Sequence, residues 1–135
     1  MTSGAGFNDW RDLREFRGVA LNESFVLSWR LNGVSLRLDI DLSLLPSHVF
    51  YESPRPAERA CYRPALLEFP ACTILRRRGD EDDAQSGAAY AASLGHGKIT
   101  DLRRVADGRY VISGRFGDIE IASERPVLSI KETMT

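Results

Sequence analysis

The fold is decided by the stretch Ser24-Phe-Val-Leu-Ser-Trp-Arg-Leu-Asn-Gly-Val-Ser-Leu-Arg-Leu-Asp-Ile-Asp-Leu42, in which apolar residues alternate with others on both sides of an Asn-Gly pair. Alternation with a period of two is typical of β-strands that bury one face. An Asn-Gly pair favours a two-residue type I′ turn, because both residues accept the positive φ that this turn needs. The stretch therefore predicts an antiparallel hairpin with its turn at Asn32-Gly33.

Counting outward from this turn predicts the register and the buried face. Four apolar pairs are expected to oppose each other: Leu31 with Val34, Trp29 with Leu36, Leu27 with Leu38 and Phe25 with Ile40. Opposed residues lie on the same side of a sheet, so these eight side chains would form the core face. The other face would carry the charged residues Arg30, Arg37, Asp39 and Asp41.

Similar short apolar segments recur further along the chain, separated by turn residues. They are 65–69, 72–76, 98–105 and 109–114, followed by the segments around Ile119 and Leu128. Asp107-Gly108 predicts a second type I′ turn. Together with the first hairpin this gives about eight short strands, which favours a mainly β fold, either an antiparallel β-sandwich or an open barrel.

A short helix is expected before the first strand. Apolar residues recur every three positions at Phe7, Trp10, Leu13 and Phe16. This spacing places them on one side of a helix from about Asn8 to Arg17, with Asn8 suited to the N-cap and Gly18 to the position after the last turn. The helix would cover one end of the sheet, and residues 1–6 would be disordered.

Two segments are expected to lack regular structure. Residues 44–64 hold four of the six prolines, which fit poorly inside hydrogen-bonded elements. The apolar content of this loop, including Leu45, Val49 and Phe50, argues for packing rather than disorder. Residues 78–95 combine opposite charge blocks with an Ala-rich stretch, which predicts an exposed, mobile connection with one helical turn after Ser86.

Composition favours a single globular domain over residues 1–135. The chain has 43% hydrophobic and 27% charged residues, which is ordinary for such a domain. Its formal net charge of −1 argues against nucleic-acid and anionic-membrane partners. No apolar run is long enough to span a bilayer, and the first residues do not form a secretory signal, so we expect a cytoplasmic protein.

Residues that could carry catalysis are few and have no recognisable spacing. Cys61 and Cys72 are expected to be free thiols, because nothing in their spacing indicates a disulfide or a zinc module. A Cys-His nucleophile pair has no local signature, and no phosphate-binding or hydrolase motif occurs. Asp39 and Asp41 would share a solvated sheet face. We therefore expect no metal, no cofactor and no enzymatic activity.

The candidate binding residues lie in the proline-rich loop and just after it. They are His48, Tyr51, Glu52, Tyr62 and Arg63, the densest mixture of aromatic and hydrogen-bonding side chains outside the expected core. Prolines lower the entropy of the free loop, so presenting these groups to a partner would need less ordering on binding. Packing is the alternative, in which Tyr51 and Tyr62 only close one end of the fold.

Several short motifs resemble a group of small bacterial proteins that have no assigned function. These motifs are Leu21-Asn-Glu-Ser24, Val26-Leu-Ser-Trp29, Leu45-Pro-Ser-His48 and Cys61-Tyr-Arg63. In size and pattern such proteins are similar to the immunity proteins of bacterial polymorphic toxin systems. The resemblance implies a small β-rich protein that works by binding a toxin domain, and it implies no catalytic residue.

Three hypotheses for function follow. The first is a binding module, immunity-like, that acts on an unknown protein partner. The second is a small hydrolase or isomerase with its site in the 44–64 loop. The third is a homodimer formed through an exposed sheet face or edge. Perturbed titratable groups that converge in a deep pocket would favour the enzyme, whereas a flat, polar-rimmed aromatic patch would favour a partner surface.

Overall fold

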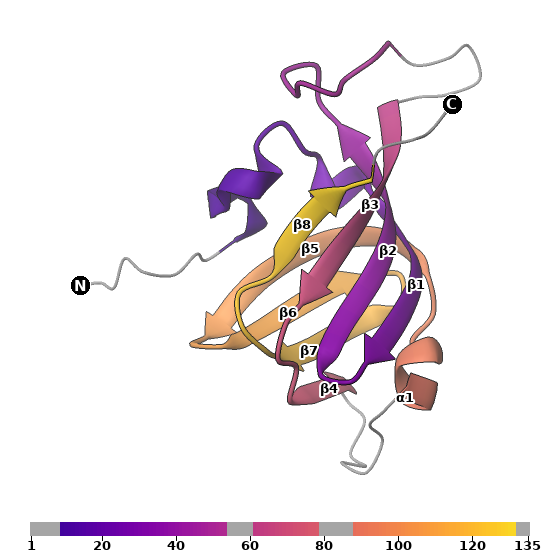
Figure 1. Ribbon diagram of the computed structural model, residues 1–135, viewed down its shortest axis with the longest axis vertical. Helices are drawn as coiled ribbons and strands as arrows, with labels where there is room; N and C mark the ends of the chain where they lie inside the picture. Colours follow the sequence, from indigo (N-terminus) through magenta and orange to yellow (C-terminus); the bar gives the residue numbers. More distant parts are fainter. Residues whose placement is uncertain (1–8, 54–60, 79–87, 132–135) are drawn as a thin grey trace.

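The computed structural model describes residues 9–53, 61–78 and 88–131, which form eight antiparallel strands, 3₁₀ turns and one short helix (Figure 1). The strands are β1 (Phe25–Asn32), β2 (Ser35–Leu44), β3 (Cys61–Phe69), β4 (Ile74–Arg77), β5 (Gly97–Ala106), β6 (Arg109–Gly114), β7 (Gly117–Ala122) and β8 (Val127–Ile130). They join in one sheet in the order β4-β7-β6-β5-β1-β2-β3-β8. The predicted mainly β, antiparallel fold is thus confirmed. No helix in the described ranges is long and apolar enough to cross a bilayer.

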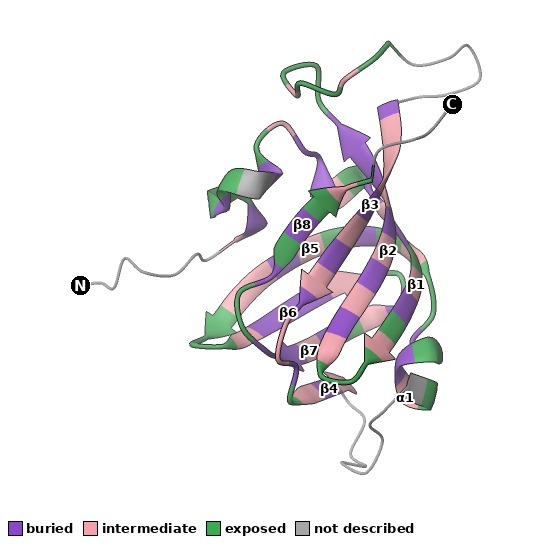
Figure 2. Cartoon of the chain, viewed as in Figure 1, coloured by how far each residue is buried: buried purple, intermediate pink, exposed green. Residues whose placement is uncertain are grey.

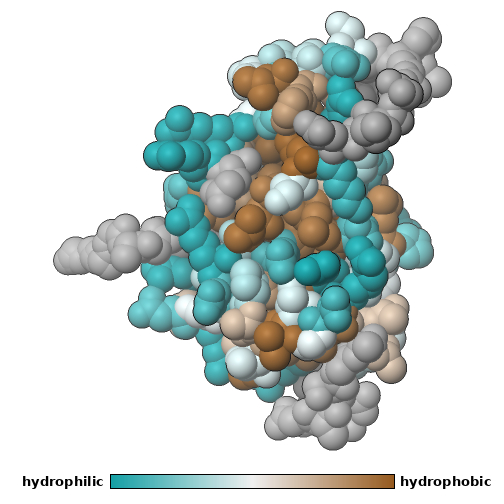
Figure 3. Space-filling model, in the orientation of Figure 1, coloured by the Kyte–Doolittle hydropathy of each residue, from teal (hydrophilic) through white to brown (hydrophobic). Residues whose placement is uncertain are grey.

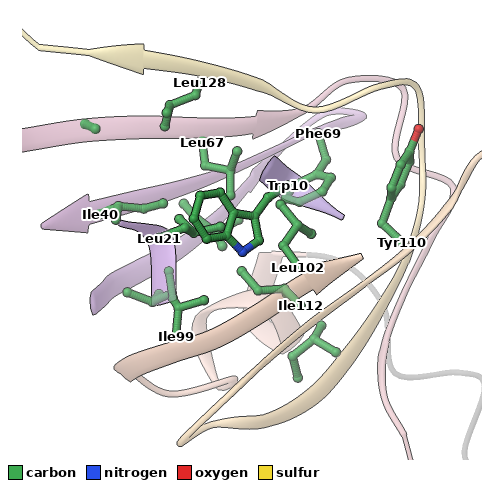
Figure 4. Close-up of a cluster of buried hydrophobic side chains, with 14 of the residues drawn as sticks. Trp10, Leu21, Ile40, Leu67, Phe69, Ile99, Leu102, Tyr110, Ile112 and Leu128 are labelled. Atoms are coloured by element: carbon green, nitrogen blue, oxygen red, sulfur yellow. The ribbon is translucent and has the colours of Figure 1, made fainter. Parts of the chain in front are cut away.

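The sheet curves so that its two halves face each other across a shared core (Figure 1). Buried and more exposed residues alternate along the strands, as expected for a sheet with one buried face (Figure 2). Trp29 of β1 packs edge-on against Phe116, with ring centroids 5.3 Å apart. Trp10 lies between the side chains of the two halves (Figure 4). The interior is therefore filled by side chains from both halves and from the N-terminal segment.

The link from β3 to β4 and the link from β7 to β8 meet at one corner of the molecule. There β3 leads into β4, and β7 leads into β8. The backbone N–H of Glu124 donates to the carbonyl of Pro70, and that of Thr73 donates to the carbonyl of Ala122, each at 2.8 Å. The first of these hydrogen bonds links the two halves of the sheet, because Pro70 follows β3, which pairs with β8, and Glu124 follows β7, which pairs with β4.

The first hairpin forms, but its turn lies one residue later than predicted. Gly33 and Val34 occupy the two-residue loop, and Asn32 already belongs to β1. Gly33 has a φ of +64° and Val34 does not have a positive φ. This is the pattern of a type II′ turn, which needs glycine only at its first central position. Trp29 consequently opposes Leu38 instead of the predicted Leu36. This shift by two residues keeps both side chains on the core face.

A β-bulge in β1 changes which of its residues are buried. The register shifts between Val26 and Ser28. As a result Val26 and Trp29 are both buried, and Leu27 between them is 57% exposed rather than part of the core face. An extra residue in one strand reverses the alternation beyond it. In β2 the predicted alternation holds up to Leu42, with Leu36, Leu38, Ile40 and Leu42 buried, and the last two residues of the strand are buried as well.

The second hairpin has the predicted loop but a different turn type. Asp107 and Gly108 connect β5 and β6. Only Gly108 has a positive φ, of +67°, so the turn is not type I′. The register shifts beside it, between Arg104 and Ala106, and this irregularity adapts the turn to the two strands.

The N-terminal segment forms two 3₁₀ turns instead of the expected helix. They are η1 (Trp10–Asp12) and η2 (Arg14–Phe16), separated by Leu13 in an extended conformation. A 3₁₀ helix has three residues per turn, so the three-residue spacing of Trp10, Leu13 and Phe16 fits it better than an α-helix. All three are buried, while Phe7, Asn8 and residues 1–6 lie outside the described residues.

The proline-rich segment is partly regular, in contrast to the prediction. Strand β2 continues to Leu44 and β3 begins at Cys61, so Pro64 lies inside a strand. The carbonyl of Pro64 accepts the N–H of Lys131, which follows the last residue of β8. Proline is tolerated here because its missing N–H faces a position where the neighbouring strand has already ended. Residues 54–60 lie outside the described residues.

The expected connection at 78–95 is also partly packed. After Gly87, α1 (Ala88–Ala92) supplies the helical turn that the sequence predicts, and Ala91 and Leu94 are buried rather than exposed. The hydroxyl of Tyr90 accepts the backbone N–H of Arg77 at 2.8 Å, which ties α1 to β4. Residues 79–87 lie outside the described residues.

Candidate partner-binding site

The described part of the predicted loop, residues 45–53, is fixed by backbone hydrogen bonds at one end of the sheet. Leu45 donates its N–H to the carbonyl of Gly18 at 2.8 Å, which attaches the loop to the N-terminal segment. Two turns follow, since His48 donates to the carbonyl of Leu45 at 2.9 Å and Tyr51 donates to that of His48 at 3.0 Å. The loop is therefore structured although it contains no strand.

Gly18 allows the loop to approach the N-terminal segment closely. Its φ is +75°, a conformation that residues with a side chain rarely adopt. A Cβ at this position would also lie 3.0 Å from the Cα and Cβ atoms of His48. Glycine is thus needed both for the backbone conformation and for the contact.

His48 shapes the loop through its ring as well as its backbone. The imidazole Nδ1 accepts the N–H of Phe50 at 3.0 Å, and the two rings lie 5.7 Å apart. Burial lowers the pKa of the His48 imidazole. The neutral ring is the form that leaves one nitrogen free to accept a hydrogen bond, so burial and bonding favour the same state.

Arg63 connects the loop to β3. Its guanidinium Nη2 lies 3.0 Å from Glu52 Oε2 and donates to the carbonyl of Phe50 at 3.4 Å. The thiol of Cys61, at the start of β3, accepts the N–H of Glu52 at 3.4 Å. The carboxylate of Glu52 is exposed, so this ion pair forms a polar rim at the end of the loop.

Tyr51 and Tyr62 are both half-buried aromatic residues with packing contacts. Tyr51 packs against the core, and the ring of Tyr62 lies 6.0 Å from that of Phe25. Tyr62 opposes Ser43 whereas Arg63 opposes Leu42, so their side chains leave β3 on opposite faces. Of the five predicted residues, His48, Glu52 and Arg63 are thus linked through the loop backbone, and Tyr62 is turned away from them.

The most exposed part of the loop is apolar, which the sequence interpretation missed. Val49 is 87%, Phe50 48% and Leu45 44% exposed, although packing was expected for all three. We call these three residues the loop patch. Figure 3 shows hydrophobic side chains at this end of the molecule, beside hydrophilic ones. The available sequence signal is the pair Val49-Phe50, which follows Pro46, Ser47 and His48 and so belongs to no alternating strand.

The described residues form no catalytic arrangement around the loop. The ring of His48 and the thiol of Cys61 each accept a backbone N–H of the loop rather than each other. Cys61 and Cys72 are buried and unbridged, and burial raises the pKa of the Cys72 thiol, which disfavours the reactive thiolate. Within the same ranges, no group of three His, Cys, Asp or Glu side chains could hold a metal ion.

No protein-family model matches this chain, and no significant similarity to curated proteins or to solved structures is found. Its function must therefore be inferred from its own surface.

Proposed function

We propose that this protein is a non-enzymatic binding module that holds a protein partner at the loop patch. The observation that carries the proposal is the exposure of Leu45, Val49 and Phe50 within one short loop, beside the Glu52–Arg63 ion pair. Apolar surface surrounded by polar groups is typical of protein–protein interfaces. Aromatic and aliphatic anchors such as Phe50 would enter pockets of the partner, and the ion pair would lie at the rim.

The described part of the loop, residues 45–53, is held in place by hydrogen bonds within the chain, which supports this function. The bonds of Leu45 to Gly18 and of Phe50 to the His48 ring hold the patch in one conformation. Ordering a loop on binding costs free energy, and a preformed loop avoids most of this cost. The surface is therefore suited to tight binding of a complementary rigid partner.

In this proposal the protein is immunity-like, acts in the cytoplasm, and the partner is a toxin domain, in line with the resemblance of its motifs. The sheet serves as a rigid scaffold, and we interpret it as an open barrel. The hydrogen bond of Glu124 to Pro70 supports this interpretation, since it joins the link between β7 and β8 to the link between β3 and β4. A scaffold of this kind presents one fixed loop without moving.

Affinity capture with matched surface variants tests the proposal. Val49→Ser combined with Phe50→Ser removes the apolar groups of the loop patch. Leu27→Ser combined with Val34→Ser is the control, because these residues are 57% and 63% exposed on the first hairpin, outside the loop. We expect the wild type and the control to retain the same protein partner, and the loop variant to lose it by about tenfold or more in affinity, as for removal of an interface anchor.

Circular dichroism should show the same unfolding midpoint for both variants and for the wild type, because exposed apolar residues contribute little to stability. Retention of the partner by the loop variant, or equal loss by the control, would contradict the proposal.

A further inference from the structure

One hydrogen bond to a histidine ring sets the direction of the loop patch. The imidazole Nδ1 of His48 accepts the backbone N–H of Phe50 at 3.0 Å. The ring thus occupies the place that an asparagine or aspartate side chain has in an Asx turn, where it accepts the N–H two residues further on. Val49, the most exposed residue of the patch, lies between the two bonded residues. The conformation of Val49 and Phe50 therefore depends on one acceptor atom.

Only the neutral imidazole can supply this acceptor. In the neutral ring one nitrogen carries a proton and the other has a free lone pair. In the imidazolium both nitrogens carry protons, so Nδ1 would present a donor to the N–H of Phe50. Turning the ring over does not restore the bond, because Nε2 is protonated in that form as well. Protonation of His48 therefore breaks the hydrogen bond.

The backbone of His48 is fixed, so the loss of this bond must be taken up by the residues that follow. Its N–H donates to the carbonyl of Leu45 at 2.9 Å, and its carbonyl accepts the N–H of Tyr51 at 3.0 Å. Gly18 packs against it so closely that a Cβ there would lie 3.0 Å from the Cα and Cβ atoms of His48. Movement is thus directed to Val49 and Phe50, the two apolar anchors.

The surroundings of the ring favour its neutral form. Burial disfavours the charged imidazolium and lowers the pKa of His48 below its ordinary value of 6.5. Glu52, the carboxylate nearest to His48 along the chain, lies 3.0 Å from Nη2 of Arg63 and is neutralised by it. The other charged and titratable groups on the segments around the ring are Arg17, which precedes Gly18, and Tyr51, Cys61 and Tyr62. The hydrogen bond is therefore complete at neutral pH and is lost only in acidic solution.

We propose that His48 makes partner binding at the loop patch dependent on pH. With the neutral ring the loop presents Val49 and Phe50 in one conformation, and with the protonated ring this turn opens. Affinity falls when the binding conformation is only partly populated. The partner should therefore be held at neutral pH and released in mildly acidic solution. This inference rests on the proposed function and adds the regulation of the same surface.

Nuclear magnetic resonance of the free protein tests the switch without the partner. The backbone amide of Phe50 and the ring of His48 are followed from about pH 8 to about pH 5, the range in which histidine changes its charge. We expect both signals to shift with one midpoint, below pH 6.5, and the amide proton of Phe50 to move upfield as its hydrogen bond is lost. His96→Asn is the control, because it removes the other histidine and should leave this titration unchanged.

Two replacements of His48 separate the acceptor from the charge. His48→Asn keeps a side-chain acceptor for the N–H of Phe50 but does not titrate, and His48→Ala removes the acceptor. Both keep a Cβ and hence the contact with Gly18. At neutral pH the Asn variant should bind the captured partner within about twofold of the wild type, and the Ala variant about fivefold more weakly, as expected for one lost hydrogen bond.

Acidification should then affect the wild type alone in this way. From about pH 7.5 to about pH 5.5 the affinity of the wild type should fall about fivefold more than that of His48→Asn, whose own change measures any titration of the partner. Equal unfolding midpoints of the three proteins at neutral pH, measured by circular dichroism, would show that the differences do not arise from loss of the fold.

Three results would overturn this inference. They are a Phe50 amide that does not follow the His48 ring, an equal loss of affinity in the wild type and in His48→Asn on acidification, and unchanged affinity of His48→Ala at neutral pH. If the amide does not respond but the Val49→Ser and Phe50→Ser variant loses the partner, the proposed function stands and the switch is wrong. If the amide follows the ring but that variant keeps the partner, the proposed function is wrong, and the pH dependence of binding at the loop patch is wrong with it.

Discussion

The outer face of β1 and β2 and the N-terminal 3₁₀ turns both carry several arginines, but they use them differently. On the sheet face Asp39 accepts from Lys131 at 2.7 Å and from Ser28 at 2.9 Å, and lies 3.1 Å from Arg30. In the second of the N-terminal turns Arg14 has no side-chain partner among the described residues. Charges that are paired within the chain join strands to one another, and charges that are not paired remain available to another molecule. The pattern of ion pairs on a surface thus separates a face that joins strands from one whose charges are not used within the described residues.

The outer face of β4, β6 and β7 has the same paired character. Glu120 lies 3.2 Å from Arg76 Nε and 3.0 Å from Arg109 Nη1, and its side chain is 12% exposed. Val111 opposes Glu120 on this face and is fully buried. Long charged side chains cover apolar surface with their aliphatic stems, so this cluster shields Val111 from solvent. The carboxylate of Glu120 on β7 therefore connects this strand to β4 and to β6 above the buried Val111.

The largest expected effect comes from breaking this pairing. Glu120→Gln removes the negative charge of the carboxylate that pairs with both Arg76 and Arg109. We expect the free energy of unfolding to fall by about 2 kcal/mol, since a partly buried charge loses its partner. Urea unfolding measures the change, and Glu124→Gln, at an exposed position after β7, serves as the control. A loss below about 0.5 kcal/mol, which is ordinary for surface changes, would show that the pairing is not structural.

The second expected effect concerns Asp39 and pH. Burial acts to raise the pKa of this carboxyl, but hydrogen bonds from Lys131 and Ser28 and the charges of Lys131 and Arg30 outweigh it and hold the pKa below its ordinary value of 3.8. A lowered pKa stabilises the folded state above the ordinary value, and this contribution is lost as the pH falls through the lowered one. Asp39→Asn should therefore lower the free energy of unfolding by about 1 kcal/mol at neutral pH.

The same variant should differ less and less from the wild type as the solution is acidified. Below the lowered pKa, Asp39 is protonated in the wild type and no longer attracts Lys131 or Arg30. Unfolding curves recorded from neutral pH down through the lowered pKa should show a constant difference above the ordinary value of 3.8 and convergence of the two proteins below it. A constant difference over this range would mean that the hydrogen bond of Ser28, rather than the charge, accounts for the effect.

Much of the fold was predictable because one strand carries a complete pattern. In β2 apolar residues occupy every second position, so its face follows from the sequence. In β1 Val26 and Leu27 are both apolar, and period two does not reveal which of them a bulge turns outward. The turn was misplaced because Asn32 also suits a type I′ loop. Long-range packing against the other half of the sheet decides between such alternatives.

The candidate site was predictable in position but not in its chemistry. The prolines mark the loop, and Arg63 and Glu52 do meet there. The exposure of Val49 depends on the direction in which the turns at His48 point, which no local pattern encodes. The N-terminal turns show the opposite case, since the three-residue period of Trp10, Leu13 and Phe16 is visible in the sequence. The same period was interpreted as one side of an α-helix, although it fits 3₁₀ turns better.

The smallest expected effect is the one that separates the two surfaces most clearly. Arg14→Gln combined with Arg17→Gln should change the free energy of unfolding by less than about 0.5 kcal/mol, because both residues are exposed and lack partners in the described ranges. The variant should be slightly more stable than the wild type, since like charges three residues apart repel each other. Arg30→Gln combined with Arg37→Gln removes the same charge from the paired face.

The free energy of unfolding of the Arg30 and Arg37 variant should fall by about 1 kcal/mol, because Arg30 pairs with Asp39 and Arg37 Nε lies 3.7 Å from Glu68 Oε2. Salt provides an independent comparison. Screening weakens attraction and repulsion alike, so added salt should reduce both the cost of the Arg30 and Arg37 variant and the small gain of the Arg14 and Arg17 variant. If the Arg14 and Arg17 variant instead unfolds as easily as the Arg30 and Arg37 variant, Arg14 and Arg17 also stabilise the fold, and the two surfaces do not differ in this respect.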